Sequence, residues 1–87
     1  MNTTFLLMAQ YNARAVIPVE TVCRDYFSHL TPTKFVEKIR AGEISLPLVR
    51  LEKSQKAAKG VALNDLATYL DGQIAAARKD MSELHRA

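Results

Sequence analysis

The sequence predicts a mainly α-helical fold with one small β-hairpin, and three observations lead to this expectation. Apolar residues recur at helical spacing in several segments. Two short apolar runs flank a polar, lysine-containing segment near the middle of the chain, which is typical of a hairpin. The 87 residues are 48% apolar, which is enough for one modest core and not for a second. We therefore expect a single domain over residues 1–87.

The first expected element is a short helix over residues 5–12, because Asn2, Thr3 and Thr4 are good N-cap residues. Apolar side chains occupy most of its circumference. Such a helix is either buried deeply or pressed against a second chain.

An extended segment and a second helix follow. Val16 and Ile17 favour extended backbone, as does any residue before a proline, and Pro18 then opens a turn or a helix. Apolar residues return at helical spacing from Val19 to Phe27, and residues 28–30 form a tight link to the next element.

The sharpest helix start in the sequence is Thr31, a capping residue, followed by Pro32 at the first helical position. Phe35 and Ile39 mark the buried side of this third helix, and Gly42 ends it. The opposite face is polar and basic, and it presents Thr33, Lys34, Glu37, Arg40 and Ala41, with Lys38 at its flank. Two helices joined by a short turn, the second with a basic outer face, predict a helix-turn-helix.

A hairpin is expected next, with one strand over residues 48–51 and the returning strand over residues 61–63. The residues between them are polar and basic, and they include Lys53, Ser54, Gln55, Lys56 and Lys59. A basic hairpin directly after a basic helix predicts the wing of a winged helix-turn-helix. The alternative is an ordinary exposed loop.

A long helix is expected at the end of the chain, over residues 64–86, with Asn64 and Asp65 as its cap. Its apolar seam consists of Leu66, Leu70, Ile74, Ala77, Met81 and Leu84. At ~1.5 Å per residue such a helix extends ~30 Å, farther than so small a core reaches. The domain is thus expected to comprise an N-terminal helix (1–13), the helix-turn-helix with its wing (16–63) and this C-terminal helix.

The positive charge is concentrated in the middle of the chain. Residues 28–62 contain seven lysines and arginines against three glutamates, whereas the rest has five basic and six acidic residues. A segregated basic surface is typical of a protein that binds a polyanion such as DNA. On charge alone, a solvated lysine-rich loop explains the pattern equally well.

The sequence argues against an enzyme or a metal protein. His29 and His85 lie far apart and a single cysteine adds no zinc site, while Ser28 and His29 lack a carboxylate in a triad pattern. Cys23 lies on an apolar helix face, where we expect it to be packed in the core. We expect no cofactor. One unpaired cysteine and the lack of a signal or membrane-spanning segment favour a cytoplasmic protein.

The order of elements from Ile17 to Leu70 resembles the excisionase-like winged helices. The matching pieces are Thr31-Pro32-Thr33-Lys34, Ala41-Gly42-Glu43-Ile44, Leu48-Val49-Arg50-Leu51 and Asp65-Leu66-Ala67-Thr68-Tyr69-Leu70. The whole chain is similar to the pyocin activator protein family. This similarity rests on the segments NTTFLLMAQYN (2–12), AVIPVETVCRDYF (15–27), GEISLPLVRLEKSQKAAKGV (42–61) and LATYLD (66–71).

The resemblance implies a phage-derived, sequence-specific DNA-binding transcription activator. Members of the family switch on genes for phage-tail-like bacteriocins by binding repeated promoter boxes, and RNA polymerase is then a possible partner. Two other classes remain open: an excisionase-type architectural protein that bends DNA, and a protein–protein adaptor whose basic wing contacts an acidic partner.

We expect the third helix and the wing to share the contact with DNA. In this hypothesis Thr33, Lys34 and Glu37 face base edges, whereas Lys38 and Arg40 lie nearer the phosphates. Thr31, at the start of the same helix, also belongs to the residues expected to contact DNA. Lys53, Ser54, Gln55, Lys56 and Lys59 are expected to act on the backbone or the minor groove.

The terminal helices are expected to form a homodimer or a higher assembly on DNA. The residues predicted for this contact are Phe5, Leu7, Met8, Tyr11, Ile74, Met81 and Leu84. The competing interpretation is that the first helix folds back on the last helix of its own chain and hides both apolar surfaces in a monomer.

Overall fold

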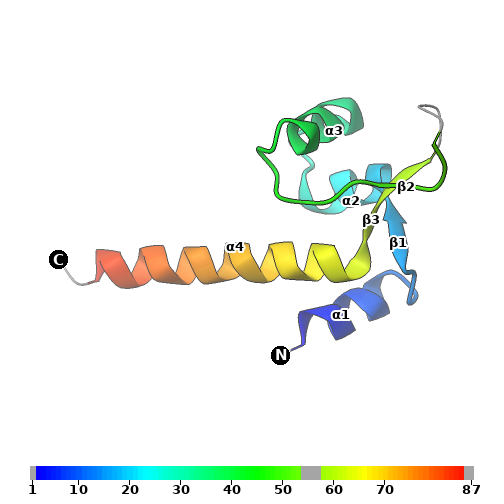
Figure 1. Ribbon diagram of the computed structural model, residues 1–87. Coiled ribbons are helices and arrows are strands. Elements are labelled where there is room, and N and C mark those ends of the chain that lie inside the picture. Colours follow the sequence, from blue (N-terminus) through cyan, green and yellow to red (C-terminus); the bar gives the residue numbers. More distant parts are fainter. Residues whose placement is uncertain (1, 54–57, 86–87) are drawn as a thin grey trace.

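The computed structural model describes residues 2–53 and 58–85, and it shows a mainly helical fold with a small antiparallel sheet (Figure 1). The general fold class is thus confirmed. The elements are, in order, α1 (Thr3–Gln10), β1 (Val16–Pro18), α2 (Val19–Tyr26), α3 (Pro32–Arg40), β2 (Val49–Arg50), β3 (Lys59–Ala62) and α4 (Leu63–Leu84).

The sheet has three strands in the order β1-β3-β2, and both pairings are antiparallel. Ile17 pairs with Val61, and Arg50 pairs with Lys59. The sequence predicted the hairpin and the extended residues before Pro18, but not that these extended residues pair with the returning strand. The first hairpin strand is also shorter than expected, because ladder pairing covers only residues 49–50 of the expected 48–51.

Local capping explains where α1 and α3 begin. The Asn2 side chain accepts a hydrogen bond from the backbone N–H of Phe5 at 3.1 Å, and the Thr31 hydroxyl accepts one from that of Lys34 at 3.2 Å. Pro32 occupies the first turn of α3, and Gly42, with φ +79°, follows its end. The predicted start and stop of α3 are confirmed.

The start of α4 differs from the expectation. The helix begins at Leu63, its N-cap residue is Ala62, and no side chain caps it. The backbone N–H of Leu63 donates to the carbonyl oxygen of Ala15 at 2.9 Å, and the Leu63 side chain is buried. Strand β3 therefore runs directly into the helix, and core packing fixes the boundary in place of a cap from Asn64 or Asp65.

One core lies between the sheet, α2, α3 and the first turns of α4, and Leu7 of α1 and the following Tyr11 belong to it. Its largest fully buried side chains are Phe35, Ile17, Leu66, Val22 and Val61. The rings of Phe27 and Phe35 are stacked with their centroids 4.6 Å apart, and that of Tyr69 lies 5.9 Å from Phe27. These aromatic contacts fix α3 relative to α2 and α4.

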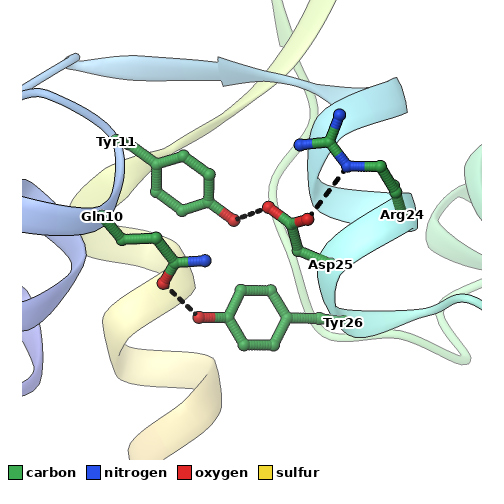
Figure 2. Close-up of polar contacts among 5 residues, drawn as sticks. All are labelled: Gln10, Tyr11, Arg24, Asp25 and Tyr26. Atoms are coloured by element: carbon green, nitrogen blue, oxygen red, sulfur yellow. Dashed lines mark hydrogen bonds and ion pairs between the residues drawn. The ribbon is translucent and has the colours of Figure 1, made fainter.

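Helix α1 lies along the first half of α4, and polar contacts tie it to two other helices. The Thr3 hydroxyl donates to the carboxylate of Asp71 in α4. Figure 2 shows the contacts with α2: the Tyr11 hydroxyl donates to Asp25 Oδ2 at 2.7 Å, and the Tyr26 hydroxyl donates to Gln10 Oε1 at 2.8 Å. Helix α1 is thereby part of the folded unit of its own chain.

The second half of α4 projects beyond the rest of the molecule (Figure 1). With this helix included, the molecule measures 52 × 28 × 19 Å. All residues from 71 to 85 are exposed. Within the described ranges, no helix has the length and apolar character needed to cross a membrane.

Candidate nucleic-acid interface

Helix α3 carries the predicted contact residues on a face that the fold leaves open. Phe35 and Ile39 turn into the core, so the opposite side of the helix points to solvent. In Figure 1, α3 lies at the edge of the molecule, apart from α4. The residues Thr31, Thr33, Lys34, Glu37 and Arg40 are exposed, and Lys38 is half-buried. The structure therefore gathers the helix part of the predicted site on one surface.

Two ion pairs join the charged side chains of this surface. Lys34 Nζ lies 3.5 Å from Glu37 Oε2, one helical turn away, and Lys38 Nζ lies 3.6 Å from Glu43 Oε1. All four side chains are at least 41% exposed, and pairs in such positions are typically worth ~1 kcal/mol or less. The lysines can therefore exchange these partners for other anions at little cost.

The hairpin residues are only partly within the described ranges. Lys53 is exposed, and Lys59 lies half-buried on β3. The predicted contact residues Ser54, Gln55 and Lys56 lie outside the described residues.

Arg50 is a basic residue of this surface that the predicted contact set does not include. It is exposed on β2 and stands directly opposite Lys59 in the antiparallel ladder, so both side chains lie on the same face of the sheet. The sequence feature that could have pointed to Arg50 as a contact residue is its place among the seven basic residues of the segment 28–62. The register that brings it beside Lys59 was not predicted, because Lys59 was expected in the loop before a returning strand over residues 61–63, whereas β3 begins at Lys59.

An open groove of about 470 Å³ connects α3 with the base of the hairpin. Thr33, Glu37 and Arg40 line it from α3, and Lys59 lines it from β3. Glu20, at the start of α2, adds a second carboxylate that no pattern in the sequence singled out. The fold thus places the helix residues and a hairpin lysine around one depression, which carries two carboxylates and two basic groups.

Burial divides the residues that were predicted to contact a second chain. Leu7 and Tyr11 are only 2% and 6% exposed, because α1 packs against α4 of its own chain. Their predicted place on an open surface is therefore wrong. Phe5, Met8, Ile74, Met81 and Leu84 are exposed. The competing interpretation is right that α1 folds back on α4, but this contact hides only part of the two apolar surfaces.

Cys23 and His29 are the residues considered for other chemistry that the structure describes in most detail. Cys23 is buried, its Sγ donates to the carbonyl oxygen of Leu30 at 3.2 Å, and burial raises the pKa of its thiol, which disfavours a reactive thiolate. His29 is exposed beside Phe27, at 6.3 Å between ring centroids. Among residues 2–53 and 58–85, no cluster of histidine, cysteine and carboxylate side chains has the composition of a metal site.

Comparison with known families identifies a match over most of the chain. The family described as "Pyocin activator protein PrtN" matches residues 3–77, which include every element up to the middle of α4. No curated protein and no solved structure matches the chain significantly.

Proposed function

Because the chain belongs to the pyocin activator protein family, we propose that it activates transcription of pyocin genes by binding promoter DNA as a winged helix-turn-helix. In this proposal α3 is the recognition helix and the β2–β3 hairpin is the wing. The observation that carries the proposal is the open face of α3, on which Thr33, Lys34 and Glu37 lie together opposite a buried apolar side.

The position of this face supports contact with the major groove of double-stranded DNA. A recognition helix needs an exposed row of hydrogen-bonding side chains on a helix held rigidly by its other side. Phe35 in the core and the capping hydrogen bond of Thr31 provide that rigidity. Lysine donates to guanine and glutamate accepts from cytosine, so Lys34 and Glu37 suit direct reading of base edges.

The hairpin supports contact with the backbone. Arg50 and Lys59 bring positive charge to one face of the sheet, and the exposed Lys53 follows β2. These basic side chains suit contact with phosphates. In this proposal the protein needs no cofactor, performs no catalysis and acts in the cytoplasm, where RNA polymerase is its partner at the promoter boxes.

Site selection from a random duplex library tests the recognition helix. We expect Lys34→Ala and Glu37→Ala each to relax the preference at one base pair by ~1–3 kcal/mol, because each removes one contact with a base edge. We expect Lys38→Ala to weaken binding to all DNA sequences alike, because in this proposal Lys38 contacts the phosphates and not a base.

The matched control is Lys79→Ala, which removes the same charge from the exposed second half of α4 and should leave both affinity and preference unchanged. Unchanged selection profiles for Lys34→Ala and Glu37→Ala would show that α3 does not read the bases. Promoter activation in a reporter, together with little bending of the bound duplex, separates an activator from an excisionase-type protein that bends DNA.

A further inference from the structure

The second half of α4 carries an apolar surface that the fold leaves uncovered. We call its residues Ile74, Ala77, Met81 and Leu84 the free stripe. At ~100° per residue they lie on the same helix face as Leu66, which is fully buried in the core. The exposure of the large residues along this face rises from 45% at Ile74 to 56% at Met81 and 74% at Leu84. This helix face therefore remains apolar beyond the point along α4 at which the rest of the chain covers it.

The free stripe lies on a helix segment that its own chain does not stabilise. All residues from 71 to 85 are exposed, and Gly72 stands where α4 leaves the domain. An isolated helix of this length is marginal in water, and an interior glycine costs ~1 kcal/mol more than alanine. Packing of the apolar face against a partner is the usual source of the missing stability.

The charges beside the free stripe are compatible with packing against a second copy of the same segment. Residues 72–85 carry Arg78 and Lys79 against Asp80 and Glu83, so the segment has no net charge when His85 is neutral. A neutral segment gains little from DNA or from an anionic membrane surface, and two copies of it do not repel each other as a whole.

We propose that the free stripe packs against the free stripe of a second copy of this chain, with the two α4 helices antiparallel. The first half of each helix is already occupied by α1 and the core of its own chain, so a parallel partner would meet the folded domain. In an antiparallel pair, the projecting half of each α4 contacts only the projecting half of the other α4. Ile74 then faces Leu84 of the partner subunit, and Ala77 faces Met81 of the partner subunit, which places large residues against small ones near the dyad.

Sedimentation equilibrium of the full chain without DNA, from about 1 to 200 µM, tests this pairing. We expect a reversible equilibrium between the 9.7 kDa chain and a species of twice that mass. The helical circular dichroism signal should rise with concentration over the same range, because pairing orders the second half of α4. Met81→Asp and Ile74→Asp should each raise the dissociation constant by on the order of a hundredfold, because each dimer then buries two carboxylates.

The matched control is Ala76→Asp, which places the same charge on the exposed opposite face of the same segment and should leave the dimer intact. The thermal unfolding of each variant's core shows that the fold is retained. A native chain that stays monomeric throughout the range overturns the proposal. So does a dimer that is insensitive to both free-stripe substitutions, since it would form through another surface such as the outer side of α1. These measurements contain no DNA, so their failure leaves the proposed function standing.

Discussion

Tyr11 shows at the scale of a single residue how α1 is fixed to the domain. Its ring is buried, and its hydroxyl donates to Asp25, which also lies 3.1 Å from Arg24 Nε (Figure 2). The hydrogen bond from Tyr11, and then that from Arg24, hold the pKa of Asp25 below its ordinary value. Burial, followed by the Asp25 hydrogen bond, raises the pKa of Tyr11. Asp25 therefore remains charged and Tyr11 remains a donor at neutral pH.

Tyr11→Phe should lower the free energy of unfolding by ~1 kcal/mol at pH 7, because it removes a hydrogen bond to a charged and largely covered carboxylate. The charged Asp25 carboxylate contributes to the free energy of unfolding in full above its pKa in the unfolded chain, which is ~4. This contribution is lost as the pH falls through the pKa of Asp25 in the folded chain, which is lower. The difference between the native chain and the variant should therefore shrink in that acidic window. Urea unfolding at several pH values measures it.

Tyr26→Phe is the control, because its hydroxyl donates to the neutral amide oxygen of Gln10. Its effect on stability should not depend on pH between about 3 and 7, the range in which carboxylates titrate. An equal and pH-independent loss of stability for both variants would contradict the role given to the Asp25 carboxylate.

Tyr11 and Leu7 also show what residue patterns cannot reveal. Helix α1 is apolar on most sides, so its sequence does not indicate which side turns inward. That choice depends on α4, far along the chain, and on Asp25. By contrast, the amphipathic pattern of α3 identified Phe35 and Ile39 as buried, and the structure confirms both.

At the scale of elements, the boundaries set by local chemistry were predictable and those set by tertiary contacts were not. Thr31, Pro32 and Gly42 mark the ends of α3 as expected, because caps involve neighbours in sequence. Helix α4 begins at Leu63 because of a bond to Ala15, and β1 joins the sheet through pairing with β3. Such partners are distant in sequence, so no local pattern indicates them.

Gly60 is a point at which β1 and β3 approach very closely. A Cβ atom there would lie 2.5 Å from Val16 Cγ1 and 2.8 Å from the Ile17 carbonyl oxygen. Gly60→Ala should lower the free energy of unfolding by ~1–3 kcal/mol, since the backbone of β1 must shift. Gly72→Ala, where nothing lies within 4 Å, should be neutral or stabilising by up to ~1 kcal/mol. Chemical denaturation that ranks the two variants in the reverse order would contradict the strand pairing.

The hairpin has its own prediction, which rests on the proposed function. Replacing Lys53, Lys56 and Lys59 together by alanine should flatten the plot of log affinity against log salt by about one unit for each phosphate that these lysines neutralise. Fluorescence anisotropy with a labelled duplex at several salt concentrations measures this slope. A variant that keeps both the affinity and the slope of the native chain would show that the hairpin does not touch the backbone.

At the scale of the whole molecule, the chain separates two surfaces. The open face of α3 and the hairpin lie at one end, and the free stripe of α4 projects at the other (Figure 1). The sequence predicted both sets of residues from basic and apolar spacing. It did not predict the groove that joins α3 to Lys59, because that groove depends on how the sheet packs beside α2.

The central claim is that α3 and the hairpin form the surface that binds DNA. Amide chemical-shift mapping of the labelled chain, titrated with a short duplex that it selects, tests this claim directly. The account predicts that the largest shifts fall on residues 31–40, 50–53 and 58–60, while residues of α1 change little. Large shifts on α1 or along α4, with α3 unchanged at saturation, would contradict it.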